Sequence, residues 1–258
     1  MQELVSVITP TYNSKKYIRD AIDSVLSQSY ANLELILIDD ASSDGTREVL
    51  KEYESSDSRV RIILNNQNSG AGISRNKGIK AARGTYIAFL DSDDAWDRNK
   101  LASQISFMQT HGYTFSYTKY AYMNESGCVI RKRNLAPNSC GYLRLLLQDC
   151  IGCSTVVINV EQLGKAYMPE LRNRQDWALW LTYIKRAGRA HGMNKSFTNY
   201  RMMKGSISSN KFRLFRFHWK VYHEIEQYGV FVSSLLFLIN IVLISYYSVF
   251  NKILVRRV

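Results

Sequence analysis

Apolar runs and amphipathic stretches alternate along the first hundred residues. Runs rich in β-branched and aliphatic side chains predict strands at 4–8, 33–38, 60–64 and 85–90. The first run ends before Pro10, and the second, LELILI, is apolar enough to be buried on both faces. Helical spacing of apolar residues predicts helices over 16–28, 47–53 and 72–82. Strand–helix units in series predict an α/β fold, in which helices cover a parallel sheet with right-handed crossovers.

The second half of the chain has a looser pattern with more aromatic residues. From about residue 99 onward, the clearest elements are a strand over 154–160 and an amphipathic helix over 177–186. We expect this half to complete the sheet and to supply a second wall of a pocket.

The end of the chain has a different character. Residues 230–250 carry no charge, and about 20 such residues can cross a bilayer as a helix. A polar stripe recurs at helical spacing, however, and both flanks are basic; the stripe comprises Ser233, Asn240, Tyr247, Ser248 and Asn251. We therefore favour a helix in the membrane interface, or a shallow re-entrant or packed hairpin, over a single span. A buried helix of a soluble domain remains the third interpretation.

Charge supports a membrane partner for this segment. The chain has a net charge of +12, and residues 201–258 hold nine Lys/Arg and two Asp/Glu. Such an excess suits an anionic partner, either nucleic acid or a phospholipid surface. Aromatic residues interleave with the basic ones over 211–220, beside the uncharged segment, and this favours the membrane interface over nucleic acid. The start, MQELVSVITP, lacks the pattern of a signal peptide, so we expect the cytoplasmic side of the membrane.

Four cysteines are too few for a disulfide scaffold. Cys150 and Cys153 have CxxC spacing, but no second CxxC or histidine pair accompanies them, so we expect reduced buried thiols rather than a zinc site.

Polar residues follow three of the predicted strands. Thr9–Asn13, Asp39–Asp40 and Asp91–Asp94 each stand at a strand's carboxyl end, where open α/β sheets bind ligands. The last of these, DSDD, crowds three carboxylates, which raise one another's pKa unless a cation neutralises them. Mn²⁺ or Mg²⁺ fits this arrangement, with Asp93 as a ligand and a diphosphate completing the shell.

The acidic cluster has three alternative interpretations. Asp94 or Asp97 would serve as the N-cap of the helix that starts near Asn99. A haloacid-dehalogenase-type phosphatase is disfavoured because Ala95 stands where its motif needs Thr or Val. A receiver domain is disfavoured because the acidic doublet Asp39–Asp40 ends the second strand rather than the first.

Four ordered motifs, VSVITPTYN, ILIDDASSDGT, NSGAGISRNKGI and GTYIAFLDSDDAW, resemble the family 2 glycosyltransferases. The resemblance is strong over residues 4–100 and looser through RNRQDW and Tyr200–Arg201. QDWALW and YRMMKGSIS are similar to bacterial enzymes that assemble O-antigen, capsule, colanic or teichuronic polysaccharides. The resemblance implies a GT-A (Rossmann-like) fold, with a mixed, mainly parallel sheet flanked by helices. Together with the basic and apolar end of the chain, it divides the sequence into a glycosyltransferase domain, 1–208, and a membrane-associating helical tail, 209–258. Residues 1–100 would bind the nucleotide sugar, and 101–208 would supply the acceptor side and the catalytic base.

The resemblance also implies roles for individual residues. Pro10 and Tyr12 would line the base pocket, and Asp40 would hydrogen-bond the uracil edge. Arg75 would lie near the nucleotide, Asp91 near the ribose or donor sugar, and Asp93 would bind the metal. Arg201 and Lys204 would belong to a loop that closes over the donor diphosphate.

Asp176 matches the family's catalytic base. A transfer that inverts the anomeric centre needs a carboxylate opposite the leaving group to take the acceptor's proton. The family's commoner pair at this site is Glu-Asp, whereas this chain has Gln175-Asp176, so the base must be Asp176 alone. A helix N-cap is the alternative role for this carboxylate. The nearby Arg172 and Arg174 have two equally supported interpretations: they contact the phosphates of the acceptor, or they are solvent-exposed without a specific role.

The main hypothesis is a metal-dependent, inverting glycosyltransferase at the cytoplasmic face of the bacterial inner membrane. It would move a hexose or N-acetylhexosamine from a UDP-sugar to a polyprenyl-diphosphate-linked glycan; homo-oligomer formation stays open. A sugar nucleotidyltransferase is disfavoured because TYNS, residues 11–14, replaces the glycine-rich loop that such an enzyme needs. A non-catalytic scaffold that binds nucleotide sugar is the third hypothesis.

Overall fold

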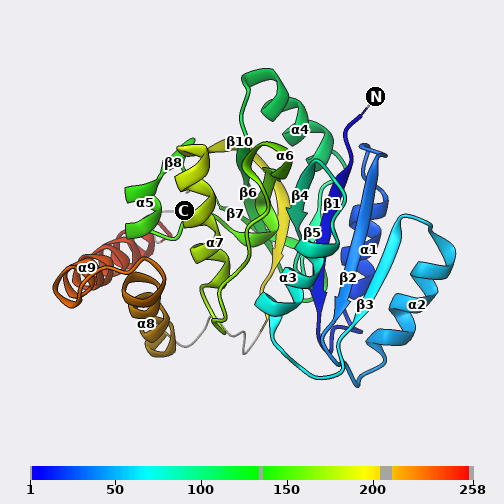
Figure 1. Cartoon of the computed structure of the whole chain (residues 1–258), viewed down its shortest axis with the longest axis horizontal. Helices are drawn as coiled ribbons and strands as arrows, with labels where there is room; N and C mark the ends of the chain where they lie inside the picture. Colours follow the sequence, from blue (N-terminus) through cyan, green and yellow to red (C-terminus); the bar gives the residue numbers. More distant parts are fainter. Residues whose placement is uncertain (1, 134–135, 204–210, 256–258) are drawn as a thin grey trace.

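The structure, a computed structural model, describes residues 2–133, 136–203 and 211–255, with side chains omitted at 131–133, 211–215 and 244–255. A mixed sheet crosses the molecule in the order β3-β2-β1-β4-β9-β6-β10-β5, with β7 beside β6 and β8 beside β10 (Figure 1). The strands are β1 Val5–Thr11, β2 Leu33–Asp39, β3 Val60–Leu64, β4 Tyr86–Phe89, β5 Ala95–Trp96, β6 Phe115–Met123, β7 Val129–Arg133, β8 Ser139–Gly141, β9 Val156–Asn159 and β10 Arg189–Arg201.

The predicted parallel sheet is confirmed for the first four strands. β1 pairs in parallel with β2 and β4, and β3 continues the parallel order beyond β2. β9 then runs antiparallel to both β4 and β6, while β6 and β10 form a long parallel pair. The strand expected over 154–160 is therefore β9, and a 3₁₀ turn, η1 (Cys153–Thr155), precedes it. Most paired positions of the sheet are parallel, as predicted.

One predicted strand end is wrong. Pro10 lies inside β1, opposite Ile38 of β2, rather than beyond the strand. The pairing of β1 with β4 extends only from Val5 to Ile8, so at Pro10 the strand has a neighbour on one side. Proline lacks an N–H donor and is tolerated where one edge of a strand is unpaired.

Helices cover both faces of the sheet. They are α1 Ile18–Leu26, α2 Thr46–Ser56, α3 Ala71–Ala81, α4 Lys100–His111, α5 Tyr142–Leu147, α6 Val160–Leu163, α7 Gln175–Ala187, α8 Lys211–Lys220 and α9 Val230–Val255, with a π-helical turn, η3, at Val221–Ile225. Strand residues alternate between two cores: Val7 packs with α1, α2 and α4, whereas Ile8 packs with α3, α5 and α7. The helices predicted in the first half and over 177–186 are confirmed, with ends shifted by a few residues.

Helix α3 lies unusually close to the sheet. A Cβ on Gly78 would come within 2.5 Å of Ile8 Cγ2 and 2.9 Å of Ile38 Cδ1. Only glycine permits this approach, which sets the start of α3 at the carboxyl ends of β1 and β2.

The first two residues of the polar stripe on the C-terminal helix face inward. Ser233 and Asn240 are buried, and Asn240 Nδ2 donates to the Leu147 carbonyl over 2.8 Å. Apolar residues are exposed instead, with Phe231 83% and Val242 65% accessible. Because α9 is one continuous helix, a hairpin within 230–250 is wrong, and the exposed apolar face disagrees with a buried core helix. Within the described ranges, no helix combines the length and apolarity needed to cross a membrane.

Candidate active site

The polar strand ends predicted to form a site meet at one edge of the sheet. The Asp40 N–H donates to the Thr11 carbonyl over 2.8 Å, which joins the ends of β1 and β2. The hydroxyls of Ser14 and Ser92 lie 2.8 Å apart, which joins the loop after β1 to the acidic turn after β4. Residues distant in sequence therefore share one surface.

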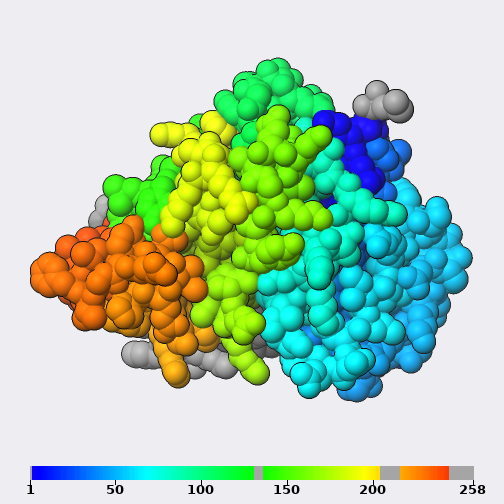
Figure 2. Space-filling view, in the orientation of Figure 1, coloured from blue at the N-terminus to red at the C-terminus, as the bar shows by residue number. Residues whose placement is uncertain are grey.

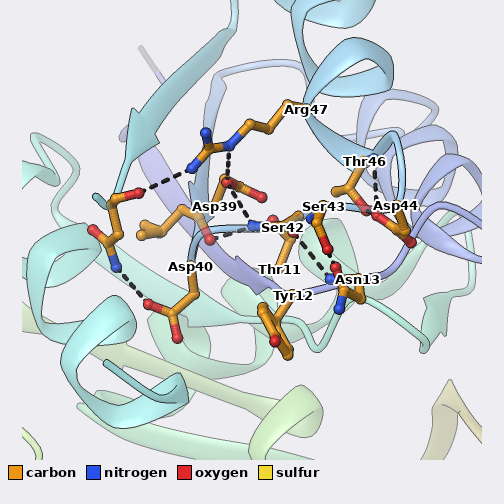
Figure 3. Close-up of polar contacts among 12 residues, drawn as sticks. Thr11, Tyr12, Asn13, Asp39, Asp40, Ser42, Ser43, Asp44, Thr46 and Arg47 are labelled. Atoms are coloured by element: carbon orange, nitrogen blue, oxygen red, sulfur yellow. Dashed lines mark hydrogen bonds and ion pairs between the residues drawn. The ribbon is translucent and has the colours of Figure 1, made fainter. Parts of the chain in front are cut away.

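The loops after β1 and β2 brace each other (Figure 3). Asn13, which has a left-handed φ of 46°, donates its N–H to Ser42 Oγ and accepts from the Ser43 N–H. Asp44 accepts from the Lys15 N–H and from both the N–H and the hydroxyl of Thr46. The loops that would face a nucleotide base are thus held by side-chain contacts rather than by regular structure.

Asp40 is a buried, ionised acceptor. Its Oδ1 accepts from Asn65 Nδ2 (2.8 Å) and the Ser69 N–H (2.9 Å), and its Oδ2 accepts from the Gly70 N–H (2.7 Å). Burial opposes ionisation, but these hydrogen bonds outweigh it and hold the pKa of Asp40 below its usual range. A carboxylate oxygen has room for two hydrogen bonds, so Oδ2 keeps acceptor capacity for a ligand.

Pro10 and Tyr12 lie on the same rim. Pro10 is buried within β1, whereas the Tyr12 side chain is 52% exposed. An exposed aromatic ring beside a buried carboxylate can cover a planar base.

Arg75 connects the two acidic parts of the site. Its guanidinium, buried in α3, forms an ion pair with Asp91 at 2.5 Å. Burial lowers the pKa of Arg75, but the facing Cys153, Asp91 and Asp176 outweigh burial, and the pKa is raised. The charges of Asp91 and Asp176 thus act on one guanidinium. Both acidic points predicted from sequence are therefore close enough to Arg75 to act on its charge.

Asp94 has a structural role. Its buried carboxylate accepts from Ser154 Oγ (2.6 Å) and the Arg201 N–H (3.0 Å). Burial, and then the charges of Asp91 and Asp93, raise its pKa well above the usual range. The N-cap interpretation is wrong for Asp94 and for Asp97, because Asn99 occupies the N-cap of α4 and Asp97 accepts from the Asn99 N–H.

Asp93 is the carboxylate of the cluster best suited to a cation. It is half-buried, and burial followed by the charge of Asp91 raises its pKa to about 6, against the lowering effect of Arg201 and Arg75. Oxygen ligands of this kind fit Mg²⁺ or Mn²⁺. Among the described residues, no group of three or more His, Cys, Asp or Glu would enclose a metal. Mg²⁺ sites with few carboxylates fill their remaining positions with water and substrate phosphates.

Asp176 lies in the first turn of α7 but does not cap it. The N-cap is Arg174, in left-handed conformation with a φ of 65° and no side-chain cap, so the N-cap interpretation of Asp176 is wrong. Asp176 is half-exposed, as a base needs to be. A Cβ on Gly72 would lie 3.1 Å from Gln175 Cγ, so the starts of α3 and α7 touch. This contact fixes the candidate base relative to the helix that carries Arg75.

The two arginines before α7 differ. Arg174 forms an ion pair with Asp149, whereas Arg172 is exposed. Arg174 therefore holds the loop that leads into α7, and plain solvation is wrong for it.

Arg201 is held by protein groups. Its side chain is 1% exposed and donates from Nε to the Asp93 carbonyl (2.8 Å), from Nη1 to the Glu125 carbonyl (2.9 Å) and from Nη2 to Asp20 (2.8 Å). It positions the acidic turn, while direct contact with the donor stays a prediction. Lys204 lies outside the described residues.

A pocket that sequence reasoning missed adjoins the acidic turn. It is a small crevice with a cavity volume of about 60 Å³, open to solvent on one side, and is lined by Asp91, Asp94, Tyr120, Gly152, Cys153, Ser154, Thr155, Thr198 and Tyr200. The closely spaced aromatic residues after Phe115 were the one sequence feature that could have indicated this pocket. The two cysteines of the CxxC sequence have different surroundings. Cys153 is buried and lines the pocket. The sulfur of Cys150 lies 3.5 Å from that of Cys140, and both are free thiols.

The sequence is similar to those of known glycosyltransferases. The chain is 46% identical over 224 residues to the putative teichuronic acid biosynthesis glycosyltransferase TuaG of Bacillus subtilis, covering 87% of this chain and 89% of TuaG. It is 39% identical over 244 residues to the UDP-Glc:alpha-D-GlcNAc-diphosphoundecaprenol beta-1,3-glucosyltransferase WfgD of Escherichia coli, covering 94% and 93%.

Solved structures share the fold. TarS 1-349 of S. aureus in complex with UDP-GlcNAc superposes with a TM-score of 0.68 at 22% identity, covering 90% of this chain and 70% of that one. The mannosyltransferase PcManGT of Pyrobaculum calidifontis, in complex with GDP-Man and Mn²⁺, gives a TM-score of 0.68 at 18% identity, covering 89% and 66%. The family profile described as glycosyl transferase family 2 matches residues 6–156, more than half of the chain. The chain belongs to glycosyl transferase family 2.

Proposed function

We propose that this protein is an inverting, metal-dependent glycosyltransferase that uses a UDP-sugar. The observation that carries the proposal is that α3 links the two acidic points: its buried Arg75 pairs with Asp91, and its Gly72 lies against Gln175, the neighbour of Asp176. Donor and base would thus work within one site. The names of TuaG and WfgD support a role in building bacterial cell-surface polysaccharide on a polyprenyl diphosphate carrier.

The nucleotide would bind where β1 and β2 end. Tyr12 would cover the uracil ring, Pro10 would line its pocket, and Asp40 would accept the ring N–H on Oδ2. The pKa of Asp40 is low, so it stays an acceptor at neutral pH. The donor in the name of WfgD, UDP-Glc, supports UDP as the nucleotide.

The diphosphate would lie beside the acidic turn. Asp93 would hold Mn²⁺ or Mg²⁺, which supplies positive charge to the diphosphate oxygens when bound. Asp91, fixed by Arg75 at 2.5 Å, would orient the ribose or the donor sugar. Lys204 would contact the donor diphosphate. Arg201 already secures the turn through the Asp93 carbonyl.

Transfer would invert the anomeric centre. The acceptor oxygen forms a bond to C1 of the donor sugar while the bond from C1 to the diphosphate oxygen breaks, and UDP leaves with that electron pair. Asp176 takes the proton from the acceptor hydroxyl. Gln175 cannot act as a base, and its contact with Gly72 helps to place Asp176.

The tail would hold the enzyme at the cytoplasmic face of the inner membrane. Helix α9 docks through Ser233 and Asn240 and leaves an apolar face outward, made of Val230, Phe231, Val232, Leu235, Leu238, Ile239 and Val242. An exposed apolar face of this size marks an interaction surface, and the basic residues of 201–258 favour anionic lipid as its partner. Figure 2 shows α9 at one end of the molecule, away from the nucleotide-binding strands. The boundary proposed at 208/209 falls among residues outside the description.

The test is transfer to a synthetic polyprenyl-diphosphate N-acetylglucosamine, with a panel of UDP- and GDP-sugars and with Mn²⁺, Mg²⁺ or EDTA. We expect transfer from a UDP-sugar that EDTA abolishes, with a product of opposite anomeric configuration to the donor. UDP-sugar binding without transfer would favour the scaffold. Formation of a UDP-sugar from UTP and a sugar phosphate would favour the nucleotidyltransferase.

A further inference from the structure

Helix α5 ends in carbonyl groups that distant parts of the chain bind. The last four C=O groups of a helix have no partner within that helix. In α5, the Arg144 carbonyl accepts from the Gln148 N–H over 2.9 Å. The next three carbonyls, those of Leu145, Leu146 and Leu147, each accept from a side chain of a different element. This short helix is therefore a point where three segments meet.

The three donors come from α7, η3 and α9, which lie beside α5 (Figure 1). Trp177 of α7 donates its indole N–H to the first of the three carbonyls over 2.8 Å. The Tyr222 hydroxyl of η3 donates to the second over 3.0 Å, and Asn240 Nδ2 of α9 donates to the third over 2.8 Å. All three donor side chains are buried. Because a buried carbonyl that loses its donor is costly, each contact specifies where its element lies against α5.

The turn between η3 and α9 is fastened to the same two helices. Glu226 has a side chain that is 2% exposed, and it pairs with Lys185 of α7 over 2.6 Å. Glu226 also accepts from the Tyr142 hydroxyl of α5, which lies 2.9 Å from the hydroxyl of Tyr228. The tail is thus bonded to α5 and α7 before α9 begins as well as along it.

The first turn of α7 depends on these neighbours for its position. Its N-cap, Arg174, supplies no side-chain cap, and the Arg174 side chain pairs with Asp149, two residues beyond α5. Trp177 directly follows Asp176 and is fully buried. Its ring meets that of Tyr222 edge-on, with centroids 5.6 Å apart and planes at 83°. Helix α5 and η3 therefore fix the backbone beside the candidate base.

A membrane anchor alone does not need these buried polar contacts. Apolar side chains would dock α9 on α5 without the cost of removing polar groups from water. Asn240 even leaves Oδ1 without a partner among the described residues, so its Nδ2 contact alone offsets the burial of the amide. The buried donors favour one defined position of the tail over loose apolar docking.

We propose that Tyr222 and Asn240 are positioning residues for Asp176, and that they hold the first turn of α7 through the carbonyls of α5. The tail is then part of the catalytic half of the enzyme as well as its membrane contact. The inference rests on the proposed glycosyltransferase function. A base must lie within hydrogen-bond reach of the acceptor hydroxyl, and a small displacement slows transfer. The nucleotide, by contrast, would bind at strand ends outside this set of contacts.

The test uses Asn240→Leu and Tyr222→Phe, which each remove one donor with little change of shape. Ser234→Ala is the matched control, because its hydroxyl donates to the Val230 carbonyl within α9 and not to α5. The acceptor is a water-soluble, short-chain lipid diphosphate N-acetylglucosamine, so that transfer does not require a membrane. In each donor variant, kcat should fall about tenfold while UDP-sugar affinity stays within about twofold. Sedimentation with phosphatidylglycerol vesicles should stay at the wild-type level, and Ser234→Ala should match the wild type throughout.

Amide hydrogen exchange gives a readout besides transfer. The Ala178 N–H bonds to the Arg174 carbonyl over 3.1 Å, in the first turn of α7. This turn should exchange faster in both donor variants, while β1 and β2 keep their protection. If the wild type transfers no sugar, the proposed function fails, whereas faster exchange still supports the link from the tail to α7.

Three results would overturn the inference. Folded donor variants with wild-type kcat and exchange would show that the tail does not act on the base. Loss of transfer only to an acceptor in vesicles, together with loss of sedimentation, would make the tail an anchor alone. Equal losses of kcat, donor affinity and protection in β1 and β2 would mean general destabilisation. Circular dichroism melting checks folding, and Asn240→Ala replaces Asn240→Leu if the leucine prevents it.

Discussion

The guanidinium of Arg201 donates from Nε to the backbone carbonyl of Asp93 over 2.8 Å. The last residue of β10 therefore holds the acidic turn after β4, more than a hundred positions earlier in the sequence. The same side chain also donates to the carboxylate of Asp20, in the first turn of α1, and to the backbone carbonyl of Glu125. One buried cation thus ties Asp20 and Asp93, in the first hundred residues, to Glu125 and the end of β10.

Removing this tie should loosen the proposed metal site. We expect Arg201→Ala to weaken Mn²⁺-dependent UDP binding about tenfold and to lower the free energy of unfolding by about 2–4 kcal/mol, because several acceptors lose their charged donor. Calorimetry and urea unfolding measure the two effects. Arg98→Ala removes an exposed arginine near the same turn and should change neither. Unaltered metal-dependent binding in Arg201→Ala would show that the tie has no positioning role.

Asp93 should account for the metal dependence. In Asp93→Asn, UDP should bind equally weakly with Mn²⁺ and with EDTA, since the amide offers no negative charge to a hard cation. Asp97→Asn is the matched control, because Asp97 lies four residues on and is exposed. Retention of the full Mn²⁺ effect on UDP affinity by Asp93→Asn would remove Asp93 as a ligand.

Asp176 should act on rate rather than on donor binding. We expect Asp176→Asn to lower kcat about 10²- to 10⁴-fold, the usual contribution of a general base, with UDP-sugar affinity within about twofold of the wild type. Single-turnover transfer and calorimetry separate the two quantities. Glu170→Gln, an exposed carboxyl shortly before α7, should leave both unchanged. A wild-type rate in Asp176→Asn would mean that another group takes the proton.

The outward face of α9 should bind anionic lipid. Phe231→Glu/Leu238→Glu should reduce sedimentation with phosphatidylglycerol vesicles at least about tenfold, because two charges enter an apolar contact. Val129→Glu/Ile130→Glu introduces the same charges at exposed apolar positions of β7, 52% and 59% accessible, and should have little effect. Equal losses in both variants would point to general charge repulsion instead of a defined surface.

Glu34 should make folding acid-sensitive. Its side chain is 4% exposed; burial opposes ionisation, but hydrogen bonds from Ser6, Arg83 and Arg61 outweigh burial and lower its pKa. A carboxyl whose pKa is lower in the folded state contributes stability above its unfolded pKa of about 4.3, and this contribution disappears as pH falls through the folded pKa. Glu34→Gln should therefore lose about 1–3 kcal/mol at pH 7 and progressively less below pH 4.

Urea unfolding between pH 7 and pH 3 measures this dependence, with Glu48→Gln on an exposed position of α2 as control. A deficit in Glu34→Gln that is constant across this pH range would rule out ionisation of Glu34 as its source.

Local sequence patterns were sufficient to predict part of the candidate active site. Asp40 and Asp91 follow buried strands directly, and parallel strands present their carboxyl ends at one edge, so their proximity followed from spacing alone. The separate roles of the aspartates in DSDD did not follow from spacing, because three aspartates within four positions look alike in sequence. Contacts from distant residues distinguish them: Arg75 pairs with Asp91, while Ser154 and Arg201 bind Asp94.

The sequence by itself determined the alternation of strands and helices, the sheet edge that carries the acidic residues and the family to which the chain belongs. These properties depend on periodicity and on short motifs, which are local. Only the tertiary structure decided that Arg201 braces the acidic turn, that the ring of Tyr122 on β6 packs against that of Tyr200 on β10, and that α9 buries Ser233 and Asn240 while exposing its apolar face. Each of these depends on which surfaces meet across the fold, and pairing between distant segments is set by the packing of the whole chain.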